Sequence, residues 1–197
     1  KADTESLRLS ISLLNDITQS VRTMMVQDVS LRNVKLKQVK LCDVVEEAAK
    51  FFREISEPKG ISIYVSGVDS EYLVLANESL LKNQVINNLL SNAIKFSPDG
   101  SAIDMEISDD HDYVTLAIKD KGVGIDNSRL NTIFEVRSGK STPGLRGEKG
   151  TGFGLNIVKS FMEHFGGLVE VTSSTDKPGS GTTFYLKFPN KLRNALG

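Results

Sequence analysis

The chain has 197 residues, of which 39% are hydrophobic, enough to bury the core of one domain beside a smaller appendage. Its 24 Lys and Arg balance 25 Asp and Glu, so the charge gives no support for a nucleic-acid partner. The single cysteine, Cys42, excludes an internal disulfide and fits a reducing compartment, which predicts a cytoplasmic location. No run approaches the roughly 18 apolar residues of a membrane span, so no membrane contact by this fragment is expected.

The first thirty or so residues contain neither Gly nor Pro and predict one long helix over 1–34. One helix cannot bury both sides of its apolar stripe, so we expect it to bundle with another chain or a missing segment. Packing on the chain's own domain is the alternative. The chain begins without an initiator Met, and we expect it to be a piece of a longer protein. The stripe follows alternating steps of four and three: Leu7, Ile11, Leu14, Thr18, Val21 and Met25.

Residues 35–42 suit a linker that enters a short edge strand, and helices and strands interleave beyond it. Asp43 and Asn77 are expected to cap helices. Adjacent strand pairs imply hairpins, so we predict an α+β, two-layer sandwich over 43–190, with a mixed sheet, helices on one face and a tail at 191–197. The predicted helices span 43–55, 77–96, a short segment ending at Phe134, and 153–165; the strands span 61–65, 72–75, 102–108, 113–119, 168–172 and 183–188.

The helix predicted over 77–96 carries a polar stripe opposite its apolar face. The stripe consists of Gln84, Asn88, Asn92 and Lys95. It contains no acid to balance Lys95, which suits an anionic ligand held together with a hard metal ion. An Asn carbonyl oxygen can ligate Mg²⁺, and Lys95 adds point charge for phosphates. Taken alone, the stripe also fits a solvated helix face.

Two glycine-rich turns follow this helix. Asp120 ends a strand, and Gly122 and Gly124 behind it would let a flat ligand approach the backbone. The Asp120 carboxylate could accept a hydrogen bond from an exocyclic amine such as adenine N6. The second turn, residues 150–155, opens a helix whose free amides attract phosphate. Each segment on its own also fits an ordinary turn.

In order and spacing, these segments resemble the catalytic ATP-binding domain of two-component sensor histidine kinases. That family belongs to the GHKL superfamily shared with DNA gyrase, and it implies the Bergerat ATP-binding fold over about 43–190. Any one segment is a weak signal, whereas five in order are highly specific. Residues 84–96 resemble the N box, 120–125 the first glycine box, 133–135 the F box, 147–155 the second glycine box and 179–184 the last glycine motif.

The resemblance implies ATP or ADP and Mg²⁺ as cofactors. Asn92 is then the expected metal ligand, Asn88 and Lys95 the expected phosphate contacts, and Asp120 the adenine reader. Residues 135–150 become an ATP lid, with Arg137, Lys140, Arg146 and Lys149 as candidate phosphate contacts. The expected catalytic residues are Asn88, Lys95 and Lys140. Further nucleotide contacts are expected from Gly122, Gly124, Ile125, Phe134, Arg137, Lys149, Gly150, Thr151, Gly152, Gly154, Leu155 and Thr183.

Asn88 stands where gyrase-like relatives carry a glutamate that activates water. An amide is a poor general base, so this departure favours ATP transfer over hydrolysis. Neither His111 nor His164 fits the family's phosphoacceptor motif. The N-terminal helix is therefore interpreted as the second helix of the dimerisation hairpin, and this fragment alone is not expected to autophosphorylate.

The resulting hypothesis is an ATP-dependent protein-histidine kinase module. It would transfer the γ-phosphate to a histidine on a helix absent from the fragment, for relay to an aspartate of a response regulator receiver domain. The resemblance also implies a homodimer through the N-terminal helix, and allows the cytoplasmic portion of a membrane-bound sensor. The alternatives are a gyrase-like ATPase clamp, a serine-directed GHKL kinase and a non-catalytic dimerisation module.

Overall fold

Buried and less buried side chains alternate along the central strands, and the buried apolar side of each strand faces one layer of helices. This alternation decides the architecture. The computed structural model describes residues 34–68, 70–135, 142–148 and 152–190. In spatial order the main sheet contains β2 (Ser62–Ser66), β4 (Ala102–Asp109), β5 (Tyr113–Asp120), β7 (Gly181–Pro189) and β6 (Leu168–Ser174). β2 runs parallel to β4, and the other neighbours are antiparallel. The predicted mixed sheet is therefore confirmed.

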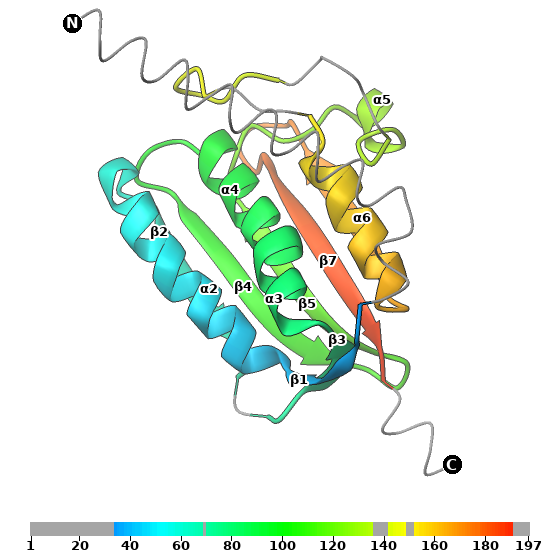
Figure 1. Ribbon diagram of the computed structural model, residues 1–197. Helices are drawn as coiled ribbons and strands as arrows, with labels where there is room; N and C mark the ends of the chain where they lie inside the picture. Colours follow the sequence, from blue (N-terminus) through cyan, green and yellow to red (C-terminus); the bar gives the residue numbers. More distant parts are fainter. Residues whose placement is uncertain (1–33, 69, 136–141, 149–151, 191–197) are drawn as a thin grey trace, which may run out of the picture.

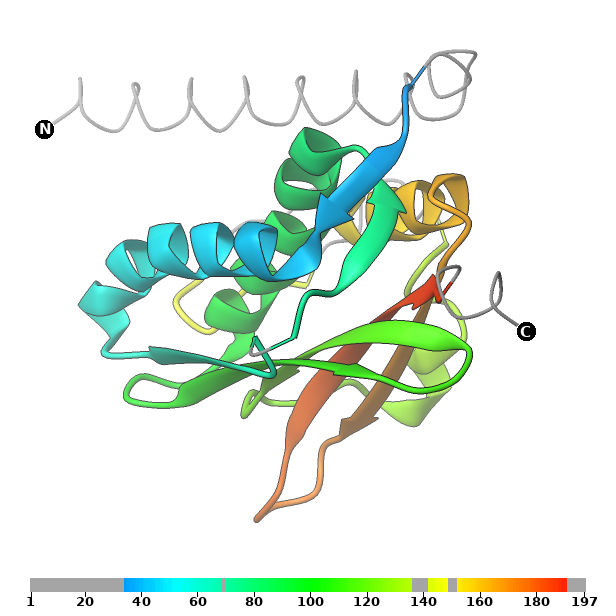
Figure 2. The same cartoon turned by 90° about the horizontal axis from the view of Figure 1, so that it is seen from below.

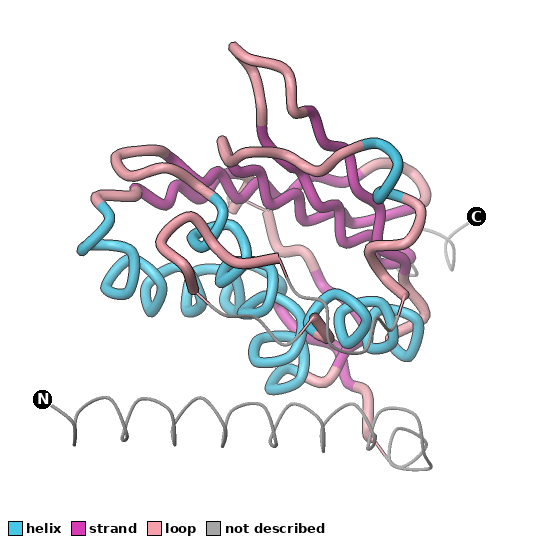
Figure 3. Tube along the Cα trace, turned by 90° about the horizontal axis from the view of Figure 1, so that it is seen from above, coloured by secondary structure: helices cyan, strands magenta, loops and turns pink. Residues whose placement is uncertain are grey.

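Three helices cover one face of this sheet: α2 (Leu41–Ser56), α4 (Asn87–Phe96) and α6 (Gly154–His164). They lie side by side in Figure 1, and the views along the sheet separate a helix layer from a strand layer (Figures 2 and 3). The buried cluster fills the space between the layers. The predicted two-layer α+β sandwich is thus confirmed.

A separate antiparallel ribbon pairs β1 (Lys37–Lys40) with β3 (Leu73–Ala76). β1 occupies part of the predicted linker and runs directly into α2. The backbone N–H of Leu41 donates to Tyr72 O at 2.9 Å, so a backbone carbonyl serves the start of α2. The prediction that Asp43 caps this helix was therefore wrong.

The segment predicted as one helix over 77–96 has three parts. α3 (Glu78–Leu80) is followed by a π-helical stretch, η3 (Leu81–Ile86), and then by α4. The predicted cap is confirmed, because Asn77 Oδ1 accepts a hydrogen bond from the N–H of Leu80 at 3.2 Å. The apolar face is also confirmed: Leu89, Leu90, Ala93 and Ile94 are buried.

The short helix α5 (Asn127–Leu130) ends before the predicted Phe134. The N–H groups of Thr132 and Glu135 bond to carbonyls three residues back, so the chain continues as tight turns. The predicted N-terminal helix over 1–34 lies almost entirely outside the described residues and stays a prediction. Among the residues that are described, no helix is both long enough and apolar enough to cross a membrane.

Candidate functional site

The polar face of α4 looks toward the first turn of α6. The side chain of Asn88 donates from Nδ2 to Gln84 O at 2.6 Å, which leaves its Oδ1 directed at Gly154. A Cβ placed at Gly154 would lie 3.0 Å from that oxygen, so a glycine here keeps space between the two helices. The N-cap of α6, Phe153, provides no side-chain hydrogen bond to the helix start. The first turn of α6 therefore lies close to the amide oxygen of Asn88, and its start has no side-chain cap.

Asn92 and Lys95 continue this face toward the end of α4. The half-buried side chain of Asn92 makes no hydrogen bond with any described residue, so its carbonyl oxygen is available to a ligand. Lys95 Nζ donates to Thr142 O at 3.1 Å and lies 4.9 Å from the ring centre of Phe96. Burial lowers the pKa of the Lys95 ammonium, and the carboxylate of Glu148 opposes that effect.

Asp120 is a buried carboxylate at the end of β5, with 7% of its surface exposed. Its Oδ1 accepts hydrogen bonds from the N–H of Gly122 at 2.8 Å and of Thr182 at 3.2 Å. Burial raises the pKa of Asp120 to about 6, and the two backbone hydrogen bonds act in the opposite direction. Because both bonds go to Oδ1, the second carboxylate oxygen remains an acceptor for a ligand's N–H group.

The glycines behind Asp120 are required by the protein's own backbone. A Cβ at Gly122 would lie 2.6 Å from Phe96 O, and one at Gly124, where φ is +74°, would lie 2.0 Å from Ser174 O. The sequence-based expectation was a close approach by a ligand. The structure shows the first glycine box packed between the end of α4 and the end of β6, and the close approach of a ligand stays a prediction. The half-buried Ile125 is fixed there too, since its N–H donates to Ser173 Oγ at 2.8 Å.

The threonine beside Asp120 is Thr182, which the sequence analysis missed. Thr182 pairs with Asp120 in the β5–β7 ladder, and its side chain is buried, with 6% exposed. Thr183 pairs with the exposed Lys119 and, as the next residue along the strand, faces the opposite side of the sheet. Thr182, rather than Thr183, therefore shares the side of the sheet that carries Asp120, and the nucleotide contact of Thr183 stays a prediction. The sequence alone does not give the register of β7 against β5, which decides which of the two threonines lies beside Asp120.

The F-box residue Phe134 packs as part of the site's wall. Its ring meets Phe184 edge-on, with ring centres 6.4 Å apart, and its carbonyl accepts from Asn156 Nδ2 at 3.1 Å. Leu155 packs against the core from the first turn of α6. Gly152 has φ +78°, a conformation that favours glycine. The remaining predicted contacts lie outside the described residues: Arg137, Lys140, Lys149, Gly150 and Thr151.

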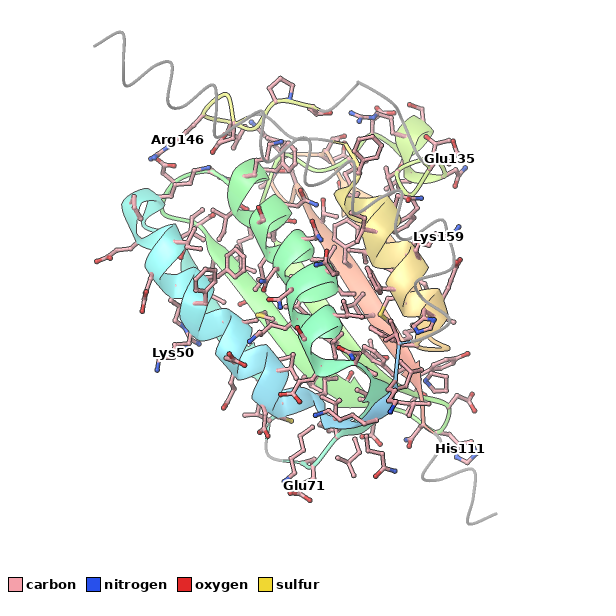
Figure 4. All side chains as sticks on the ribbon, in the orientation of Figure 1. Lys50, Glu71, His111, Glu135, Arg146 and Lys159 are labelled. Carbon is pink, nitrogen blue, oxygen red and sulfur yellow. The ribbon has the colours of Figure 1, made fainter. Side chains whose placement is uncertain are left out.

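The described segment of the predicted lid, residues 142–148, lies against the end of α4. The N–H of Leu145 donates to Lys95 O at 3.2 Å, and Arg146 pairs with Asp99. Figure 4 places Arg146 at the corner where the lid segment approaches the ends of α2 and α4. Glu148 Oε1 lies 2.7 Å from Lys59 Nζ. The polar stripe itself contains no acid, but Glu148 of the lid segment brings a carboxylate close enough to affect Lys95.

Lys59 and Glu148 are functional candidates that sequence reasoning missed. Lys59 lies in the 3-10 turn η2 (Glu57–Lys59) after α2, and only 9% of its side chain is exposed. The hydrogen bond from Lys59 holds the pKa of Glu148 at about 2. Nothing local in the sequence signals this pairing, because the two residues belong to segments that meet only in the folded chain.

A family model described as histidine kinase-, DNA gyrase B-, and HSP90-like ATPase matches residues 77–192. Among curated proteins, the chain is 31% identical over 162 residues to the autoinducer 2 sensor kinase/phosphatase LuxQ of Vibrio vulnificus (strain YJ016), covering 80% of this chain and 19% of LuxQ. It is 31% identical over 169 residues to the sensor histidine kinase Hik2 of Synechocystis, covering 80% of this chain and 38% of Hik2. The chain thus spans about a fifth of the length of LuxQ.

Two solved structures resemble the fold closely. The mycobacterial sensor histidine kinase MprB is 26% identical with a TM-score of 0.65, covering 78% of this chain and 97% of that one. Full-length ShkA in complex with AMPPNP is 26% identical with a TM-score of 0.71, covering 94% of this chain and 36% of ShkA.

The raised pKa of Asp120 predicts a specific dependence of stability on pH. Its folded-state value is about 6 against an ordinary 3.8, so between these values the folded chain binds more protons than the unfolded chain. The free energy of unfolding therefore falls as pH rises through this window. We predict that Asp120→Asn, which removes the buried charge, is more stable than wild type by up to roughly 3 kcal/mol above pH 7, and that this difference vanishes below pH ~3.

Urea unfolding of the ligand-free chain at several pH values measures this difference. Asp176→Asn, which removes an exposed carboxylate in the turn between β6 and β7, is the matched control. A stability difference for Asp120→Asn that does not change with pH would contradict the assignment of a buried, desolvated carboxylate.

Proposed function

The chain belongs to the histidine kinase-, DNA gyrase B-, and HSP90-like ATPase family, as an ATP-binding catalytic domain of the sensor histidine kinase type, and from this premise we propose that it transfers the γ-phosphate of ATP to a histidine on a helix outside this sequence. One observation carries the proposal. The N–H of Val123, in the first glycine box, donates to Phe96 O at 3.2 Å, which joins the Asp120 turn to the end of α4. An adenine reader and a phosphate-binding face are thereby parts of one site.

Asp120 is suited to select adenine. At neutral pH, above its pKa of about 6, the side chain is mainly a carboxylate and presents an oxygen that no described N–H group occupies. The adenine N6 amine can donate to that oxygen. A base with a carbonyl at this position would place two acceptors against each other in a buried setting, which is strongly unfavourable.

The phosphate end would use groups from two helices. Lys95 supplies a cation, and the uncapped amides at the start of α6 supply the N–H groups that favour anions. Asn88 faces that helix start across Gly154. Together these groups could orient the triphosphate and balance charge that develops on it during transfer.

The donor set of this face also fits Mg²⁺. The described residues contain no group of three or more His, Cys, Asp or Glu side chains that could hold a metal, so a dedicated protein cage is not what they offer. Mg²⁺ commonly takes few protein ligands and completes its shell with phosphate and water. The unpaired amide oxygen of Asn92 would be its protein ligand, and the ion would neutralise phosphate charge when bound.

The carboxylates of the described site favour transfer over hydrolysis. Asp120 lies at the adenine end, and Glu148 is paired with Lys59 and has a pKa of about 2. A carboxylate with so low a pKa is a weak general base, and the amide of Asn88 is weaker still. Steady phosphate release without any partner would favour an ATPase clamp instead. The proposal has four further parts. The acceptor histidine lies on a partner helix, and a receiver domain takes the phosphate from it. The chain dimerises through residues 1–34 and works in a cytoplasmic setting.

Replacing Asn92 tests the metal assignment. We expect Asn92→Ala to weaken ATP binding in Mg²⁺ by roughly 10- to 100-fold, toward the wild-type affinity in excess EDTA, because the amide oxygen that holds the ion is lost. Adenosine should bind as it does to wild type, and phosphorylation of a supplied histidine-bearing helix should fall to background. Calorimetry measures the affinities, with Asn83→Ala, an exposed residue of η3, as the control. Unchanged Mg²⁺-dependent affinity in Asn92→Ala would defeat the metal assignment.

Base discrimination tests Asp120 directly. We predict that wild type prefers ATP to inosine triphosphate by about 100-fold or more, since inosine offers an acceptor where adenine offers a donor. In Asp120→Asn the amide can donate to that acceptor, so the preference should narrow by at least about tenfold. Competition binding with both nucleotides provides the ratio. Equal discrimination by the variant and wild type would show that another group reads the base.

A further inference from the structure

The carboxyl end of α4 is held by three distant segments. The last four carbonyls of a helix lack partners within it. Ile94 O accepts from Lys59 Nζ at 3.0 Å, Lys95 O from the N–H of Leu145 at 3.2 Å, and Phe96 O from the N–H of Val123 at 3.2 Å. The turn after α2, the lid segment 142–148 and the first glycine box therefore meet at one helix end.

Glu148 gives the lid segment its shape. Its Oε2 accepts from the N–H of Arg146 at 2.8 Å, and its backbone carbonyl accepts from the N–H of Gly144 at 2.9 Å. Its other carboxylate oxygen, Oε1, pairs with Lys59 Nζ at 2.7 Å. The backbone and side chain of Glu148 thus close the segment into a loop, and its side chain ties that loop to the body of the domain.

The loop also sets the position of Lys95. Lys95 Nζ donates to Thr142 O at 3.1 Å. A Cβ at Gly144 would lie 2.5 Å from Lys95 Cγ, so the loop backbone packs directly on the stem of this lysine. Movement of the loop would release both the stem and the ammonium group.

We propose that Lys59 is a positioning residue for the nucleotide site. By pairing with Glu148 it holds the lid segment 142–148 against α4, and that segment fixes the ammonium of Lys95 where the phosphates bind. The phosphate role of Lys95 rests on the proposed function, whereas attachment of the lid segment by Lys59 does not. A role confined to capping α4 is the competing explanation, and it predicts no selective effect on the lid or on phosphate binding.

The two partners differ in how their loss should act. Lys59 is 9% exposed, whereas the Glu148 side chain is 35% exposed. Glu148→Gln leaves the buried ammonium of Lys59 without its carboxylate and with only the carbonyl of Ile94 as a described partner, which destabilises the fold. Lys59→Met leaves a carboxylate that solvent can reach, and methionine retains much of the apolar stem. Lys59→Met is therefore the cleaner probe.

Amide exchange in the ligand-free chain of 197 residues tests the attachment. We expect Lys59→Met to accelerate exchange at the Leu145 amide by roughly tenfold or more while leaving Leu90, inside α4, unchanged. Lys37→Met is the matched control, because Lys37 pairs with Glu78 at the same 2.7 Å but on the exposed ribbon. Wild-type exchange at Leu145 in Lys59→Met would overturn the proposal. Equal acceleration at Leu145 and Leu90 would also overturn it, since Lys59 would then only stabilise the fold.

Binding of ATP and of adenosine tests the positioning of Lys95. Lys59→Met should weaken ATP binding by roughly 5- to 30-fold and leave adenosine within about twofold, because adenosine has no phosphates. The double variant, Lys59→Met with Glu148→Gln, should bind ATP no more weakly than the single variant with the lower affinity, since both changes break the same ion pair. Unchanged ATP affinity, or equal weakening for both ligands, would overturn the positioning role.

The two readouts separate this inference from the proposed function. If wild type binds no adenine nucleotide, the proposed function fails, and the phosphate role of Lys95 fails with it. Faster exchange at Leu145 in Lys59→Met would in that case still establish that Lys59 attaches the lid segment.

Discussion

The carbonyls at the end of α4, which lack partners within the helix, impose the constraint on which the candidate site depends. A helix end buried without hydrogen-bond donors is costly, and here the donors come from the turn after α2, the lid segment and the first glycine box. Satisfying one helix end therefore fixes the relative positions of three functional segments. Lys95 sits in the last turn, where its positive charge also suits the negative end of the helix.

Asp120 is a group in the same region that costs stability in the ligand-free chain. Its carboxylate is buried with a pKa raised to about 6, so its ionised form is unfavourable in the folded chain without a ligand. The two N–H groups that support it come from the glycine box and from β7. The glycines there are dictated by contact with Phe96 and Ser174, which hold the turn rigid. A rigid, under-satisfied acceptor is what selective recognition of an amine requires.

Sequence patterns captured the parts of the structure that depend on local or periodic information. The apolar face of α4, the Asn77 cap and the hairpin order follow from side-chain spacing and capping chemistry, and the resemblance added the site segments. The failures have non-local causes. Asp43 does not cap α2 because the helix already begins at Leu41, whose N–H donates to the carbonyl of Tyr72, just before β3. That Thr182 shares the side of Asp120, and Thr183 does not, depends on the register of β7 against β5. The Lys59–Glu148 pair arises only when the lid meets α4.

The proposed function requires that a nucleotide binds where the polar face of α4, the Asp120 turn and the start of α6 meet. Backbone chemical-shift mapping of the chain with Mg²⁺ and a non-hydrolysable ATP analogue tests this most directly. The predicted result is a continuous set of perturbed amides that includes Asn92, Gly122 and Gly154. Nucleotide binding at this site would be contradicted by no perturbation at all. It would also be contradicted by perturbations confined to another part of the surface, such as the groove of about 400 Å³ between α2 and η3 beside Phe51.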